Sequence, residues 1–216
     1  MIARLRRLLP SNGFARNVSV LAGGTAAGQL IMVAVSPLLT RLYSPDDFGL
    51  LAVYAGLLAT LTVIASLRYE IAIPLPEDDQ DGANAALASL FVVLIMTALC
   101  ASVVWLWGNF ITQTLNTPAL EPYLWLLPLG LLLTGIYQVF TFWAVRTKAF
   151  PAIARTKLTQ SIAGAIVQVG GYALGPVALL LGTVANKATG STTLIRQTLN
   201  NHGPHFRAVR PRGVRQ

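Results

Sequence analysis

Long apolar runs recur along the chain, separated by short polar stretches. The first two runs, 18–40 and 48–67, each approach the roughly 20 residues that a helix needs to cross about 30 Å of hydrocarbon. Neither run alternates with a period of two, which excludes a membrane barrel and leaves helices to satisfy the backbone polar groups in lipid. The pattern therefore predicts an all-α, polytopic membrane protein with about six transmembrane helices. The expected spans are 18–40, 48–67, 83–107, 122–145, 158–174 and one that begins at 177.

A tight polar turn joins the first two runs. Pro45 disfavours a helical conformation at Ser44 and so ends the first span. Ser44 and Asp46 suit the cap of the second helix, and Asp46 and Asp47 fall at the favourable end of its dipole. We expect this second helix to continue as far as Ile73, where prolines stop it. The two runs therefore form a membrane hairpin.

The first and sixth runs contain small and polar residues that bear on helix packing. Gly24 and Gly28 have the small-xxx-small spacing that allows close helix approach. In the sixth run, the polar stretch 186–193 follows ten largely apolar residues. Lys187 alone costs about 2.5–3.5 kcal/mol at a helix centre. We therefore expect this span to be marginal in lipid and to need the bundle or a partner copy. The predicted regions are 1–16, a basic interfacial segment, 17–199, a six-helix transmembrane lobe, and 200–216, a basic disordered tail.

Composition and charge support a membrane protein and indicate its orientation. The chain is 54% hydrophobic and 11% charged, whereas a soluble domain carries about a quarter charged residues. The net charge of +8 would suggest nucleic acid in a soluble chain, but here the basic residues fall on alternate connections, which the positive-inside rule explains without such a partner. We therefore expect both termini in the cytoplasm and Arg41 outside. The inside set is Arg4, Arg6, Arg7, Arg16, Arg68, Arg146, Lys148, Arg155, Lys157 and the C-terminal basic residues.

No group of residues has the pattern of a catalytic centre or a metal site. Both histidines, His202 and His205, lie in the tail, and the acidic residues cluster in connections. The single cysteine, Cys100, lies among apolar neighbours and is expected to be a small core side chain. We therefore predict no enzymatic activity and no cofactor.

A few polar side chains inside the runs are candidates for substrate binding. Arg68 either reaches the membrane surface as an anchor or receives an anionic substrate. Gln29 either bonds another helix or lines a cavity. Tyr137 and Thr141 share one helix face, with Gln138 beside them, and form either an interfacial belt or a wall that contacts sugar. The candidate substrate-binding residues are Arg68, Gln29, Tyr137, Gln138, Thr141 and Gln168.

Three short motifs near the N-terminus carry a family resemblance. They are RLYSPDDFG at 41–49, Arg68-Tyr69-Glu70, and PLPEDD at 74–79. With them, residues 17–196 resemble the N-terminal half of the polysaccharide biosynthesis family of oligosaccharide-lipid flippases. These are O-antigen and exopolysaccharide translocases of the multidrug/oligosaccharidyl-lipid/polysaccharide exporter superfamily. The end of the sixth span and the tail depart from the family pattern, and the chain provides only one lobe of a two-lobe fold.

The resemblance implies a function. Such proteins carry undecaprenyl-diphosphate-linked oligosaccharide across the bacterial inner membrane by alternating access, through a cavity that is often cationic. Arg68 would then meet the diphosphate, and the other candidates the sugar. The implied partners are the lipid-linked oligosaccharide, membrane lipids, a second lobe or second copy, and polysaccharide assembly proteins. The alternatives are a multidrug-type exporter, a membrane-embedded polymerase or ligase, and a truncated, non-functional fragment.

Overall fold

The computed structural model describes residues 13–76 and 78–207, and the side chains of 15–76 and 78–200. Over these residues the chain is all-α, as predicted. The predicted interfacial segment 1–16 and tail 200–216 lie largely outside the described residues. The long helices are α2 (Gly13–Leu42), α3 (Pro45–Ile64), α4 (Asp79–Thr114), α5 (Leu126–Arg146), α6 (Phe150–Gly170) and α7 (Pro176–Arg207). Short 3-10 helices are η1 (Tyr69–Ala72), η2 (Pro118–Tyr123) and η3 (Tyr172–Leu174).

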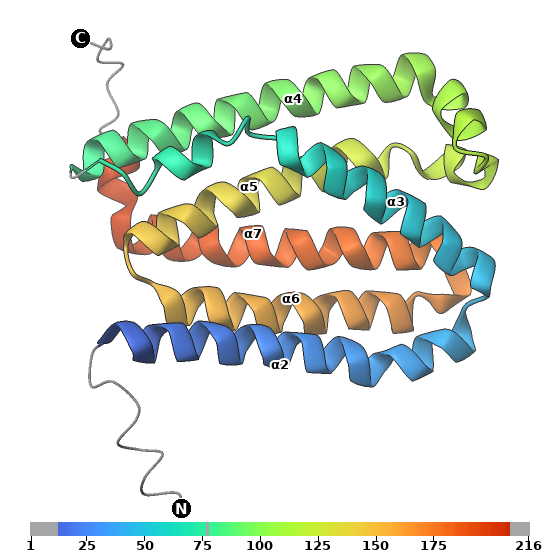
Figure 1. Ribbon diagram of the computed structural model, residues 1–216, viewed down its shortest axis with the longest axis horizontal. Helices are drawn as coiled ribbons and strands as arrows, with labels where there is room; N and C mark the ends of the chain where they lie inside the picture. Colours follow the sequence, from blue (N-terminus) through green and yellow to red (C-terminus); the bar gives the residue numbers. More distant parts are fainter. Residues whose placement is uncertain (1–12, 77, 208–216) are drawn as a thin grey trace, which may run out of the picture.

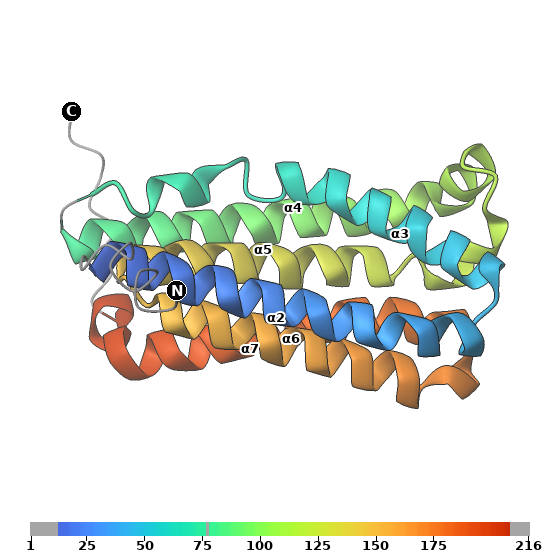
Figure 2. The same ribbon diagram turned by 60° about the horizontal axis from the view of Figure 1, so that its bottom comes forward.

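The long helices run side by side and form one elongated bundle (Figure 1). The α2–α3, α4–α5 and α6–α7 connections gather at one end, which we call the hairpin end. The α3–α4 and α5–α6 connections lie at the opposite end, which we call the Arg146 end after the last residue of α5. Helix α6 packs between α2 and α7, and α5 packs against α7 and α4 (Figure 2). The order in space therefore differs from the order in sequence.

Four helices are long and apolar enough to cross a membrane. They are α2 from Ala15 onward, α3, α4 and α5. Helices α6 and α7 have 21 and 32 residues and run alongside these four. Over the described residues, however, both are too polar to be candidate membrane spans. The chain is therefore a polytopic helical membrane protein in which α6 and α7 depend on their neighbours to cover polar groups.

The turn at Ser44 forms as predicted, but the helix that follows it ends early. The Ser44 hydroxyl accepts the backbone N–H of Asp47, whose carboxylate accepts the backbone N–H of Ser44. The expected continuation of α3 to Ile73 is wrong, because the backbone turns left-handed at Leu67 and Arg68, with φ of 49° and 63°. A segment of irregular backbone and the short η1 helix therefore replace the last turns of α3.

Other predicted boundaries shift in ways that matter for charge. Helix α4 bends at Trp107, where φ is −125°, and then continues to Thr114, beyond the span end predicted at 107. Helix α6 begins at Phe150 rather than 158, because Pro151 suits the first turn of a helix. Lys157 therefore lies within a helix. Helix α7 passes unbroken through 186–193 and ends at Arg207, beyond the boundary predicted at 199.

Glycines bring α6 into close contact with both neighbours. A Cβ atom on Gly24 would lie 2.5 Å from Ala154 Cβ, and one on Gly28 would lie 2.9 Å from Ser161 Oγ. The predicted small-xxx-small contact therefore forms between α2 and α6. On the other side of α6, a Cβ atom on Gly164 would lie 3.2 Å from the carbonyl oxygen of Gly182 in α7.

Two tyrosines tie helices together by hydrogen bonds near the hairpin end. The Tyr54 hydroxyl of α3 donates to the carbonyl of Leu126 at 3.0 Å. The Tyr43 hydroxyl, in the α2–α3 turn, donates to the carbonyl of Gln168 in α6 at 2.5 Å. Burial, together with the nearby Asp47 carboxylate, raises the pKa of Tyr43. The raised pKa favours the protonated hydroxyl, which is the form that donates this hydrogen bond.

The glycine contact predicts a position-specific effect on stability. Gly24→Val should lower the free energy of unfolding by about 1–3 kcal/mol more than Gly23→Val, because only the former forces side-chain atoms into Ala154. Gly23 is the matched control, since a Cβ atom there meets nothing within 4 Å. Unfolding midpoints of the two purified variants in one detergent test this prediction. Equal midpoints would contradict it.

Candidate functional site

Two lysines from different helices approach one aromatic ring inside the bundle. The Nζ atom of Lys157, in α6, lies 5.1 Å from the centroid of the Tyr137 ring, and that of Lys187, in α7, lies 6.0 Å from it. Tyr137 itself is in α5 and is buried. At about 1.5 Å per helical residue, Lys157 lies about 10 Å along α6 from the Arg146 end, and Lys187 about 16 Å along α7 from the hairpin end. Lys157, Lys187 and Tyr137 form what we call the lysine site, which lies away from either end of the bundle.

Polar atoms without partners border the lysine site. Gln160 is only 3% exposed, and its Nε2 has no hydrogen-bond partner among the described residues. The Tyr137 hydroxyl is likewise buried without a partner in that part of the chain. Gly190 makes room here, since a Cβ atom on it would lie 2.7 Å from Gln160 Cδ and 2.9 Å from Tyr137 Cδ2. The site therefore offers both a hydrogen-bond donor, Gln160 Nε2, and an acceptor, the Tyr137 hydroxyl.

The charge balance of the lysine site favours an anion. Neither Lys157 nor Lys187 forms an ion pair with a carboxylate of the described residues. Each cation over the Tyr137 ring gains about 0.5–2 kcal/mol, but two like charges near one ring repel each other, and a lone charge at membrane depth is costly. A bound group with several anionic oxygens would satisfy both ammonium groups at once.

The predicted face of α5 lies partly at this site. Tyr137 is at its centre, and Gln138 is half-buried on the neighbouring face of the same helix. The Thr141 hydroxyl donates to the carbonyl of Tyr137 at 2.7 Å, a local bond within α5. Of these three predicted residues, only Tyr137 touches the lysines in the structure.

The two predicted glutamines on other helices have different surroundings. Gln168 is 5% exposed, and its Nε2 donates to the carbonyl of Leu179 at 3.3 Å, which links α6 to α7. It lies two turns from Gln160 toward the hairpin end. Gln29 is exposed on α2, although its neighbour Gly28 contacts α6. The structure does not bring Gln29 and Gln168 together with the lysines.

Arg68 lies on a different side of the bundle. It is exposed in the left-handed turn after α3, and the adjoining η1 helix packs against α4 and α5. Helix α5 lies between this segment and α6 and α7 in both views (Figures 1 and 2). Nearby, Glu70 is 3% exposed, and its carboxylate accepts a hydrogen bond from the Ser66 hydroxyl. Arg68 is thus a separate cation and not part of the lysine site.

Sequence reasoning missed the lysine site for a specific reason. It placed Lys157 in a connection because the fifth apolar run begins at 158, and it treated Lys187 only as an obstacle to insertion. The signal available was Pro151, which marks an earlier helix start. From that start, Lys157, Gln160 and Gly164 follow at helical spacing on one face.

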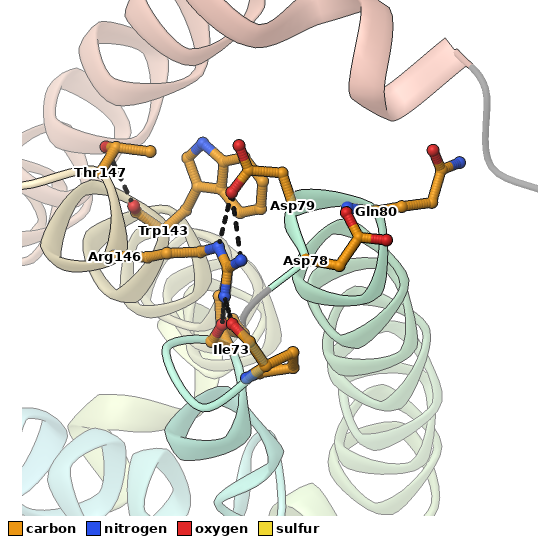
Figure 3. A network of polar contacts seen from close by, with 8 residues as sticks. Ile73, Asp78, Asp79, Gln80, Trp143, Arg146 and Thr147 are labelled. Atoms are coloured by element: carbon orange, nitrogen blue, oxygen red, sulfur yellow. Dashed lines mark hydrogen bonds and ion pairs between the residues drawn. The ribbon is translucent and has the colours of Figure 1, made fainter.

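A second polar network fastens the α3–α4 connection to α5. Arg146 Nε and Nη2 donate to Asp79 Oδ1 at 3.2 and 3.1 Å, and Nη1 donates to the carbonyls of Ile73 and Pro76 at 3.1 and 2.5 Å (Figure 3). The Arg146 side chain is only 7% exposed. A Cβ atom on Gly82 would lie 2.8 Å from its Cζ, so the glycine leaves space for the guanidinium. Arg146 therefore holds the irregular segment in place.

This network predicts a local effect of removing the guanidinium. Arg146→Gln should increase amide hydrogen exchange in residues 65–79, because two carbonyls and one carboxylate lose their hydrogen-bond donor. Leaving a buried polar group unpaired costs about 1–3 kcal/mol. Arg155→Gln is the control, since Arg155 is an exposed arginine near the same end. Mass spectrometry of exchange in detergent is the measurement. Unchanged exchange in both variants would contradict the prediction.

Comparison with known proteins identifies the family. A family model described as polysaccharide biosynthesis protein matches residues 38–211. The match includes the lysine site and Arg146, and it extends through the end of α7, so the expectation that this end departs from the family is wrong. Neither the search of curated proteins nor the search of solved structures found a match. Because the family model covers most of the chain, the protein belongs to the polysaccharide biosynthesis protein family.

Proposed function

We propose that this chain translocates an undecaprenyl-diphosphate-linked oligosaccharide across the bacterial inner membrane, for synthesis of lipopolysaccharide O-antigen or exopolysaccharide. It acts together with a second lobe or a second copy. The observation that carries the proposal is the lysine site: two cations without carboxylate partners among the described residues, over one buried ring inside the bundle, in a member of the polysaccharide biosynthesis protein family.

The chemistry of the substrate explains the need for these lysines. A diphosphate cannot cross hydrocarbon unaided, so a translocase must supply positive charge inside a protein-lined path. Lys157 and Lys187 stand on different helices but reach the same ring, so both ammonium groups can approach one diphosphate from two sides. Charge-assisted bonds to phosphate oxygens are about twice as strong as neutral ones.

Other polar atoms suit the sugars. In the proposal, Gln160 Nε2 donates to sugar oxygens, while the Tyr137 hydroxyl and Gln138 Oε1 accept from sugar hydroxyls. Arg68, exposed on the far side of α5, contacts the diphosphate at another stage of transport. The lipid chain stays in an apolar environment throughout. No covalent bond changes, so the proposed activity is transport rather than catalysis.

Charge distribution supports the proposed orientation. Arg16, Arg146 and Lys148 lie at the Arg146 end, whereas Arg41 lies at the hairpin end. By the positive-inside rule the Arg146 end faces the cytoplasm, and the hairpin end faces the outside. The lysine site then lies in the cytoplasmic half of α6, where a substrate made in the cytoplasm first enters.

The proposal predicts that both lysines of the lysine site are needed for transport. Lys157→Gln and Lys187→Gln should each reduce surface polysaccharide at least tenfold, because one cation cannot neutralise a diphosphate. Lys148→Gln is the control, since Lys148 is exposed at the Arg146 end. The measurement is surface polysaccharide in a strain that depends on this gene, at equal membrane abundance.

The outcomes separate the two candidate sites. Loss of transport in both lysine variants, with normal transport in Lys148→Gln, supports the proposal. Normal transport in both lysine variants would overturn the lysine site as the substrate site. Arg68→Ala, with Arg68→Lys beside it, tests the separate cation: we expect Arg68→Ala to lose most activity and Arg68→Lys to keep part of it, because lysine retains the charge but not the bidentate fork.

The orientation predicts which end of the bundle is accessible from outside the cell. A cysteine at Thr114, introduced after Cys100→Ser, should react with a membrane-impermeant maleimide in intact spheroplasts, because Thr114 is exposed at the hairpin end. A cysteine at Thr147, at the Arg146 end, should react only after the membrane is permeabilised. The reverse pattern would show that the orientation is inverted.

A further inference from the structure

A large apolar groove lies between α3 and α4. Its volume is about 610 Å³, and it is partly open at the side. No Asp, Glu, Lys or Arg of the described residues lines it. Representative lining residues are Val53, Gly56 and Leu61 from α3, Leu99 and Val103 from α4, and Leu131 from α5. We call it the α3–α4 groove.

The groove exists because α3 and α4 both pack on α5 but diverge from each other. Helix α3 contacts α5 where Tyr54 meets Gly130, and α4 contacts α5 where Val93 meets Gly135. Between these contacts, Gly56 faces open space, since a Cβ atom there would meet nothing within 4 Å. Both α3 and α4 are candidate membrane spans, so the open side of the groove faces the hydrocarbon of the bilayer.

One face of α5 connects the groove to polar atoms deeper in the bundle. Leu127, Leu131, Thr134 and Gln138 follow one another at the spacing of a single helix face. The first two line the groove. Thr134 is 6% exposed and its hydroxyl has no partner among the described residues, and Gln138 Oε1 is likewise buried without one. This face thus changes from hydrocarbon-like to hydrogen-bonding within about three turns.

We propose that the α3–α4 groove binds the isoprenoid chain of the lipid-linked substrate while the polar part of the same molecule lies farther along α5. The uncharged walls complement a hydrocarbon chain and exclude sugar and phosphate. Their continuity with unpartnered polar atoms on one helix face fits an amphiphile with a long apolar part, and 610 Å³ lies within the range of small-molecule sites. This inference rests on the proposed function and adds where the chain of the substrate binds.

Photocrosslinking of the full-length chain in nanodiscs tests the assignment. The probe is a diazirine-bearing analogue of undecaprenyl phosphate, in a bilayer of phosphatidylethanolamine and phosphatidylglycerol. We expect mass spectrometry to place crosslinks on α3 and α4 residues that line the groove. Unlabelled undecaprenyl phosphate should reduce these crosslinks at least fivefold, whereas the same added amount of phosphatidylglycerol, also an anionic lipid, should not.

A pair of glycines in α3 supplies matched variants. Gly56→Trp should fill the groove and reduce crosslinking at least fivefold, whereas Gly49→Trp should leave it unchanged, because Gly49 also faces open space but does not line the groove. Equal competition by phosphatidylglycerol would overturn the proposal in favour of a general lipid site. So would full crosslinking in a Gly56→Trp protein with a normal unfolding midpoint. The competition experiment uses the unaltered chain, so its result tests the proposal whether or not the Gly56→Trp variant folds.

The transport assay separates this inference from the proposed function. If the lysine variants lose transport while Gly56→Trp retains both transport and crosslinking, the groove assignment fails and the flippase function stands. If the lysine variants transport normally, the proposed function fails, whatever the crosslinking result.

Discussion

The close contact of α6 with α2 and α7 is the constraint on which the rest of the structure depends. Glycine at positions 24, 28, 164 and 182 allows these backbones to approach without intervening side chains. Helix α6 is too polar to be a candidate membrane span by itself. Its polar groups must therefore be buried against neighbouring helices. The same close approach fixes Lys157 and Gln160 in register with α7, and thereby brings the two lysines to Tyr137.

The bundle divides its chemistry between two sides of α5. On one side, α6 and α7 supply cations and amides; on the other, α3 and α4 supply hydrocarbon walls. Arg146 holds the backbone between α3 and α4 where helical hydrogen bonds are interrupted, so that two carbonyls there, of Ile73 and Pro76, accept from a charged donor. Helix α5 is therefore the shared wall between a polar and an apolar environment.

Local patterns predicted the local structure well. The capped turn at Ser44 and the Gly24–Gly28 contact followed from residue chemistry and spacing alone. The early end of α3 did not, because its left-handed residues, Leu67 and Arg68, are neither glycine nor asparagine, and the segment is held by Arg146 from far along the chain. The lysine site was not predicted for a similar reason. Hydropathy places charged residues at the ends of membrane helices, whereas only tertiary packing brings Lys157 and Lys187 to the same tyrosine ring.

The pairing of α2 with α6 also sets an order of events during biosynthesis. Gly24 cannot contact Ala154 until Ala154 has been synthesised. At about 5–20 residues per second, synthesis of the intervening chain takes on the order of ten seconds. During that interval the glycine-rich face of α2 lies in the bilayer without its permanent neighbour. The contact between α2 and α6 therefore forms only after the chain has been made as far as α6.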